Sequence, residues 1–243
     1  MNNSNHSSSR THLSTPLLFS IGVSLFGSAT TLTLALISST STDSLFWRKP
    51  LVGSLFILIC TTGIIAAFKP QECSGSSHSH QLRKPVAPAT NIVGAHRASV
   101  GLKGHHPDCG KFASHTITSG KRVFCAACIG LLFGASTAIV GAVLYFFAFL
   151  GMGDMGFWAV AVGQAGIVLC VAQLSCRRYT RSVANSAFVL GFFLTPAGID
   201  NLLHSIYADL FVLALIVFWL FTRISMSQWN HYETCRECSL PCA

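Results

Sequence analysis

Residues Gly104–Gly134 read GHHPDCGKFASHTITSGKRVFCAACIGLLFG, a stretch that joins potential metal ligands directly to an apolar helix. Its cysteine and histidine side chains are His105, His106, Cys109, His115, Cys125 and Cys128. Thiolate and imidazole groups are the usual ligands of zinc in proteins. Two alanines separate Cys125 from Cys128, so the two sulfurs lie about one helical turn apart and can bind one ion. We therefore predict a metal-binding loop over residues 105–128, fused to a membrane helix.

The composition of the chain is that of a membrane protein. Of its 243 residues, 51% are hydrophobic and only 10% are charged, whereas an average soluble domain is about 25% charged. The formal net charge is +8, but most basic residues lie beside apolar runs, where they contact anionic lipid and set the topology. We expect the lipid bilayer as the main partner. No binding of nucleic acid is expected, because no base-stacking or groove-reading motif is present.

Six apolar runs are long enough to span a bilayer, which predicts an all-α polytopic protein without a sizeable soluble domain. The predicted spans are 16–38, 51–68, 123–150, 156–174, 183–199 and 206–222, with Pro196 interrupting the fifth. The predicted segments are a disordered tail (1–15), a transmembrane hairpin (16–68), a flexible linker (69–104), the metal-binding loop (105–128), a four-helix region (123–222) and a cysteine-rich tail (223–243).

The distribution of lysine and arginine predicts the orientation of the spans. With six spans, residues 1–15, 69–122, 175–182 and 223–243 share one side, and they hold 14 of the 16 basic residues. Only Arg48 and Lys49 lie on the other side. Because basic loops stay in the cytoplasm, we predict a multi-pass protein of the cell membrane with both termini cytoplasmic. Thiols remain reduced there, so structural disulfides are not expected.

A second group of potential metal ligands, histidine and cysteine side chains, lies near the C-terminal end of the sequence. Its members are His231, Cys235, Cys238 and Cys242. Four such side chains can bind one zinc ion, and an iron–sulfur cluster also accepts three or four of them. They can instead complete the loop site, or they are reduced thiols of a frayed terminus.

Asp200 and His204 lie between the fifth and sixth predicted spans, four residues apart, which puts them on one face of a helix. An acid–base pair or a metal site is one interpretation, but we prefer a polar turn at the outer surface. We expect no acidic or basic residue deep inside a span, which argues against a charge-coupled transporter. Gly130 and Gly134 lie four residues apart in the third predicted span, and this spacing of small residues predicts a helix face that another helix can approach closely.

The motifs Pro107-Asp-Cys-Gly-Lys-Phe, Cys125-Ala-Ala-Cys128-Ile-Gly130 and Pro196-Ala-Gly-Ile-Asp200-Asn resemble a family of small prokaryotic membrane proteins called domain of unknown function 2085. The resemblance covers residues 104–210. The chain differs from the family's pattern at Gly104, Ala127 and Asn201, where the family has cysteine, arginine and glycine. The family has no assigned activity. The resemblance implies that the loop ligands and Asp200 belong to one recurring design.

Three functional hypotheses follow. The leading one is an integral membrane protein of unknown activity in which a structural metal, zinc, fixes the cytosolic loop to the third helix. The second is a membrane thiol or metal-dependent oxidoreductase that uses Cys125 and Cys128, because a helix N-terminus favours the reactive thiolate. The third is a metal transfer or sensing protein with His78, His80 and the tail as mobile donors. The sequence leaves protein partners and homo-oligomer formation open.

Overall fold

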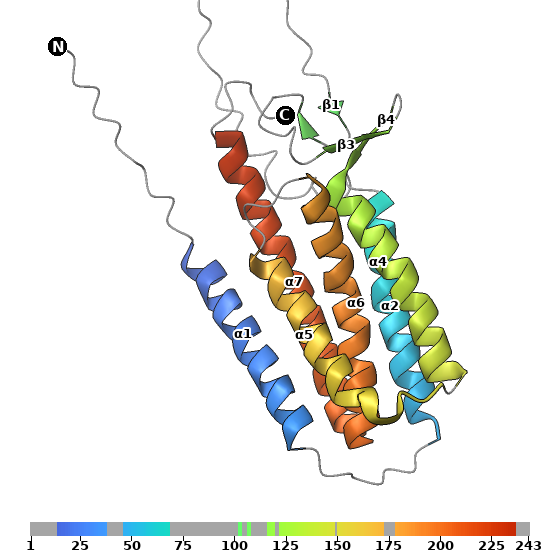
Figure 1. Cartoon of the computed structure of the whole chain (residues 1–243). Coiled ribbons are helices and arrows are strands. Elements are labelled where there is room, and N and C mark those ends of the chain that lie inside the picture. Colours follow the sequence, from blue (N-terminus) through green and yellow to red (C-terminus); the bar gives the residue numbers. More distant parts are fainter. Residues whose placement is uncertain are drawn as a thin grey trace, which may run out of the picture.

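The computed structural model describes residues 14–37, 46–68, 102–103, 106–107, 116–119, 122–148, 150–172 and 178–236. Within these residues the chain is mostly helical, and six helices are long and apolar enough to cross a membrane (Figure 1). They are α1 (Thr15–Leu36), α2 (Arg48–Phe68), α4 (Ala126–Ala142), α5 (Gly156–Ala172), α6 (Arg178–Leu203) and α7 (Ile206–Arg236). This confirms the prediction of an α-helical architecture with six apolar spans.

Short elements extend or precede the helices. A π-helical turn, Val143–Phe147, continues α4, and a 3-10 turn, Gly153–Met155, leads into α5. Two antiparallel hairpins precede α4, formed by β1 (Leu102–Lys103) with β2 (His106–Pro107) and by β3 (Thr116–Ser119) with β4 (Arg122–Cys125). We call the end of the bundle at which α4 begins the hairpin end. The opposite end, where α2 begins and α6 meets α7, is called the distal end (Figure 1).

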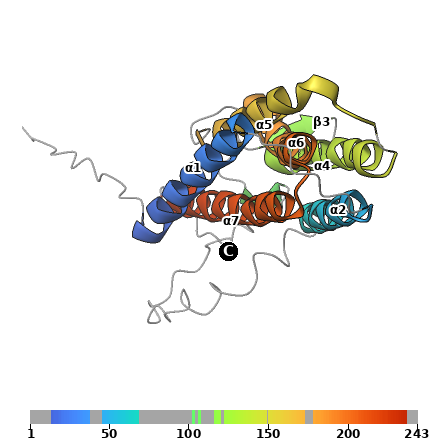
Figure 2. The same ribbon diagram turned by 90° about the horizontal axis from the view of Figure 1, so that it is seen from below.

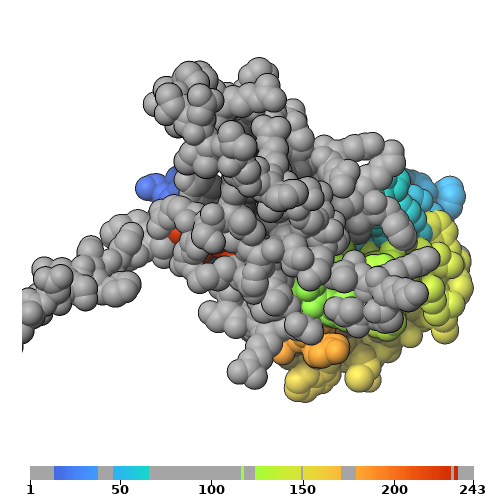
Figure 3. All heavy atoms as spheres, turned by 90° about the horizontal axis from the view of Figure 1, so that it is seen from above, coloured from blue at the N-terminus to red at the C-terminus, as the bar shows by residue number. Residues whose placement is uncertain are grey.

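The helices are arranged in two rows when seen along the bundle (Figure 2). One row is α5, α6 and α4, with α6 in the middle, and the other is α7 and α2. α1 contacts α7 and α5 and closes one side. Seen from the hairpin end, α2 and α4 lie together at one edge of the molecule (Figure 3). α6 touches α1, α4, α5 and α7, so it is the central helix.

α6 packs against its neighbours at backbone distance. A Cβ atom on Gly130 of α4 would overlap the carbonyl oxygen of Ser182, and one on Gly134 would lie 2.9 Å from Cα of Ser186. The Ser186 hydroxyl donates a 2.9 Å hydrogen bond to the Gly130 carbonyl. This confirms the predicted close-contact face. Small residues make a similar contact between α5 and α6, namely Gly163, Gly166 and Gly191.

α1 is held to α7 by two polar contacts inside an apolar interface. The Ser24 hydroxyl donates a 3.0 Å hydrogen bond to Oγ1 of Thr222. The indole Nε1 of Trp219 donates a 3.1 Å bond to the Ser24 carbonyl. All three residues are buried. Because apolar helices gain little from burial against each other in lipid, such hydrogen bonds and close packing carry the association of membrane helices.

Two predicted helix starts are corrected. α2 begins at Arg48 instead of residue 51, because Pro50 fits the first helical turn, where no backbone N–H is needed for the helix. α4 begins at Ala126 instead of residue 123, because Arg122–Cys125 pairs as a strand. The charged pair Arg48-Lys49 therefore belongs to the helix and not to a loop.

Two further predictions about the last spans are wrong. Pro196 does not interrupt α6, which runs unbroken past it, as membrane helices allow when neighbouring helices cover the freed carbonyl. α7 continues to Arg236, so residues 223–236 of the expected tail are helical. Residues 1–13, 69–101 and 237–243, which hold most of the predicted N-terminal tail, the linker and the chain end, lie outside the described residues.

Candidate functional site

Cys125 and Cys128 lie together where the β3–β4 hairpin meets α4. Cys125 is the last residue of β4 and the N-cap of α4, and its side chain is buried. Cys128 lies in the first helical turn, half-buried, with its side chain in hydrogen-bonding contact with that of Cys125. The backbone N–H groups of a first turn lack helical partners and favour negative charge nearby. The pair therefore has the proximity that a metal-binding or redox dithiol needs.

The other predicted ligands of the loop are placed only in part. His106 lies in β2. Thr116, the residue that follows His115 in the chain, pairs with Cys125 across the β3–β4 hairpin. The remaining predicted ligands lie outside the described residues, and these are His105, Cys109 and His115.

The predicted ligands of the tail are also divided. His231 and Cys235 lie in the last turns of α7, whereas Cys238 and Cys242 lie outside the described residues. Among the residues that the structure describes, no three or more His, Cys, Asp or Glu side chains are arranged to hold a metal ion. The described chain thus contributes one dithiol, and the full ligand sets of both clusters stay predictions.

Four charged side chains and one tyrosine lie together at the distal end. We call them the ion-pair cluster, and its members are Arg48, Lys49, Tyr145, Asp200 and Asp209. Nη1 of Arg48, in the first turn of α2, lies 2.6 Å from Oδ1 of Asp200 and 2.8 Å from Oδ2 of Asp209. The hydroxyl of Tyr145 donates a 2.7 Å hydrogen bond to Oδ2 of Asp200. Nζ of Lys49 lies 3.5 Å from the same oxygen and 4.5 Å from the centre of the Tyr145 ring.

Burial makes the charge balance of this cluster important. Both carboxylate side chains are 0% exposed and that of Arg48 is 4% exposed, whereas that of Lys49 is 25% exposed. Two positive and two negative groups give a formal charge of zero. A buried charge that loses its partner is strongly destabilising. The start of α2, the end of α6 and the start of α7 are therefore held in one arrangement.

The prediction that Asp200 belongs to a polar surface turn is wrong. Its side chain is fully buried and ion-paired, whereas His204 is exposed and has a left-handed φ of 51°. The backbone N–H of His204 donates a 3.2 Å bond to the Asp200 carbonyl, which closes the end of α6. Because α6 ends at Leu203, the two side chains do not share one helical face, which was the basis for expecting a joint site.

Sequence reasoning missed Asp209 as a functional residue. It lies in the first turn of α7, at the end of the predicted sixth span, and not deep inside the span. A signal was present, because Arg48, Lys49, Asp200 and Asp209 share one predicted side of the membrane and have balanced charges. The four charged side chains lie at the ends of their helices, so they do not change the expectation about the interior of the spans.

A second polar group lies between α5, α6 and α7. Nε of Arg223 donates a 3.2 Å hydrogen bond to Sγ of Cys170, and Nη2 donates a 3.1 Å bond to Oδ1 of Asn185. Nδ2 of Asn185 donates a 2.6 Å bond to the carbonyl of Arg181. Cys170 is 2% exposed. These hydrogen bonds satisfy the polar atoms where the three helices meet. The partners of Arg223 in them are the neutral side chains of Cys170 and Asn185.

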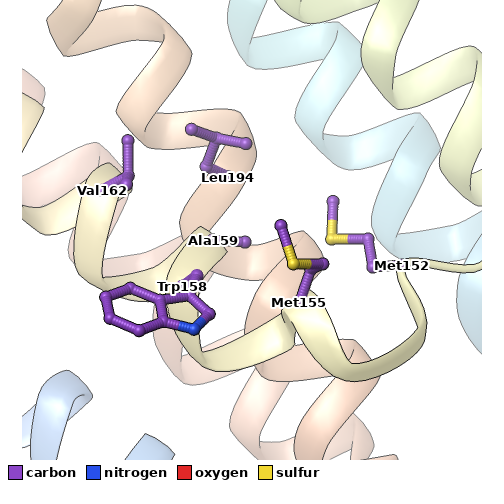
Figure 4. Close-up of a pocket in the computed structure, with 6 residues that line it drawn as sticks. All are labelled: Met152, Met155, Trp158, Ala159, Val162 and Leu194. Atoms are coloured by element: carbon purple, nitrogen blue, oxygen red, sulfur yellow. The ribbon is translucent and has the colours of Figure 1, made fainter.

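A shallow apolar groove lies on the outer face of α5 near the distal end (Figure 4). Its volume is about 400 Å³. The lining residues are Met152, Met155, Trp158, Ala159, Val162 and Leu194. None of these side chains is titratable, so the groove suits contact with lipid tails and offers no acid–base chemistry.

Comparison with known proteins adds no assignment. Family models, curated proteins and solved structures give no match to this chain. Function is therefore argued from the dithiol at the hairpin end and from the ion-pair cluster at the distal end.

Proposed function

We propose that the chain is an integral membrane protein that binds a structural metal ion, zinc, through Cys125 and Cys128 together with ligands of the preceding loop. The observation that carries this proposal is the contact between the two thiol side chains at the first turn of α4. Zinc sites in proteins use two to four such thiolates in a tetrahedral arrangement. The donor set present at the helix start fits this ion.

The remaining ligands would come from the loop before the β3–β4 hairpin. We propose Cys109 together with His105, His106 or His115, because a thiolate and an imidazole complete a tetrahedral zinc site with two cysteines. Thr116, the first residue of β3, is paired with Cys125, so the described hairpin brings the end of this loop next to the dithiol. A metal held in this way ties the loop to α4, because the free energy of metal binding becomes free energy of folding.

We also propose that the hairpin end faces the cytoplasm of a cell with this protein in its cell membrane. The supporting observation is the split of 14 basic residues against two. Those two, Arg48 and Lys49, lie close to buried carboxylates at the distal end and add no net positive charge there. In this orientation the thiols stay reduced and able to bind metal.

A second candidate function is a membrane thiol oxidoreductase, and its support is the proximity of the two thiols, which lets them form a disulfide. In that reaction Cys125 and Cys128 form a disulfide and release two protons and two electrons, which a quinone accepts to become quinol. Metal transfer or sensing remains the third hypothesis, and its donors His78 and His80 lie outside the described residues. The resemblance to domain of unknown function 2085 likewise stays a prediction.

The deciding experiment replaces both thiols, as Cys125→Ser with Cys128→Ser, and measures bound metal by elemental analysis of the purified full chain. We expect the variant to lose the metal of the loop and its segment 69–122 to become protease-sensitive, while the six helices still insert. Cys60→Ser is the control, because this buried thiol lies within the span of α2 and is not one of the predicted ligands, so the metal content should stay unchanged.

Full metal content in the double variant would refute the structural-metal proposal. If the double variant also loses a quinone-dependent thiol oxidation that the parent chain shows, the oxidoreductase function takes its place.

A further inference from the structure

We propose that Oδ2 of Asp200 and the ring of Tyr145 form a binding site for a primary ammonium group. In this structure the ammonium group of Lys49 occupies the site, and a ligand can displace it. The site lies in the ion-pair cluster at the distal end, away from the dithiol. This proposal does not depend on the metal-binding function.

The two cations of the cluster are held very differently. Nη1 of Arg48 lies 2.6 and 2.8 Å from two carboxylate oxygens, and its side chain is 4% exposed. Nζ of Lys49 lies 3.5 Å from Oδ2 of Asp200, and its side chain is 25% exposed. Charge-assisted N–H···O bonds are usually about 2.7–2.9 Å long. Arg48 is therefore the fixed counter-ion, and Lys49 is the cation that a ligand from outside can replace.

The charge of the cluster favours a cation at the position of Lys49. Without the Lys49 ammonium, Arg48 faces two buried carboxylates, which leaves a formal charge of −1. Oδ1 of Asp209, buried and without a hydrogen-bond partner among the described residues, adds to the negative potential. An unbalanced charge in an apolar surrounding is costly, so either another cation binds where Lys49 is displaced or removed, or a carboxylate takes up a proton.

The groups around Nζ select the kind of cation. The Tyr145 ring lies 4.5 Å from Nζ, within the range of about 6 Å in which an aromatic face attracts a cation. Oδ2 of Asp200, which the Tyr145 hydroxyl fixes through its 2.7 Å bond, accepts an N–H donor. An ammonium group supplies three such donors, whereas a sodium ion or a quaternary amine supplies none.

Two sources can provide a primary ammonium group at this place. Lys49 is the second residue of a membrane span, so the amino headgroup of phosphatidylethanolamine is one. A small free amine from the distal side is the other. Both present the same chemistry to Asp200 and Tyr145, and the experiment separates them.

The test uses the full chain in nanodiscs of phosphatidylcholine, with radiolabelled ethylammonium as the probe. We compare the parent chain with Lys49→Ala, and with Lys49→Gln as a second variant that keeps part of the stem. Both variants should bind ethylammonium saturably and at least about tenfold more tightly than the parent chain. Sodium and tetramethylammonium at equal ionic strength should not compete. Tyr145→Leu, added to Lys49→Ala, should remove the gain.

Competition by phosphatidylethanolamine, exchanged for part of the phosphatidylcholine, would identify the lipid headgroup as the ligand. Retained ethylammonium binding in its presence would identify a free amine. The proposal fails if neither Lys49 variant gains saturable binding. It also fails if the variant with Tyr145→Leu binds as tightly as Lys49→Ala alone, because then the cluster only joins helices.

Discussion

Removing the guanidinium of Arg48 should destabilise the bundle more than any other single charge removal at its ends. The change Arg48→Met keeps most of the side-chain length and deletes the contacts of 2.6 and 2.8 Å to Asp200 and Asp209. Two buried carboxylates then face only Lys49. Breaking a buried ion pair by removing one partner costs about 3–5 kcal/mol.

This cost should appear as a large shift of thermal unfolding. About 1 kcal/mol corresponds to roughly 2–4 °C for chains of this size, so Arg48→Met should lower Tm by roughly 6–20 °C. Adding Asp209→Asn leaves Lys49 with Asp200, restores a neutral cluster, and should recover most of the loss. Arg223→Met is the matched control, since the described contacts of Arg223 are with neutral groups and its removal should cost about 1.5–3 kcal/mol.

The measurement follows tryptophan fluorescence of the purified chain in a mild detergent during heating. A Tm of Arg48→Met equal to that of Arg223→Met would refute the reasoning about buried charge. So would a double variant that is less stable than Arg48→Met alone, because charge balance would then not decide the stability.

Two further outcomes are expected. Gly130→Ala should cost about 1–3 kcal/mol, since its Cβ would overlap the Ser182 carbonyl and push α4 from α6. Gly22→Ala, whose Cβ meets nothing within 4 Å, should be neutral or stabilising by up to about 1 kcal/mol, and equal melting of the two variants would contradict this packing. A reporter active only in the cytosol, fused after Ala243, should give signal, and an export-active reporter should give none. The reverse pattern would overturn the proposed orientation.

The apolar spans were predictable because length and hydropathy alone decide whether a segment can cross a bilayer. The contact of Gly130 with α6 was predictable for a related reason, since small residues four apart leave room for another backbone. The continuity of α6 through Pro196 was not predictable. The missing N–H of Pro196 suggested an interruption, but α6 packs among four neighbouring helices and continues past it.

The ion-pair cluster was not predictable from local pattern. Arg48 and Asp209 are 161 positions apart, and each alone is an ordinary charged residue near a span end. Only the packing of α2 against α7 brings them together. The β3–β4 hairpin did leave a signal, TITSGKRVFC over 116–125, with β-branched residues on both sides of a glycine turn. That signal is short, and it overlaps the predicted metal-binding loop.

The separation of Arg48 from Asp209 also has a consequence for the order of events during synthesis. A ribosome adds about 5–20 residues per second, so the 161 positions take roughly 8–32 s. During this interval α2 has been synthesised, but Asp209 has not. Arg48 can wait at the end of its helix, in contact with water and headgroups, without entering the hydrocarbon. α4, α5 and α6 can meanwhile pack through their glycines. The nascent chain then completes the distal end only when the first turn of α7 emerges, so a ribosome that stalls between Asp200 and Asp209 leaves Arg48 with one of its two carboxylate partners.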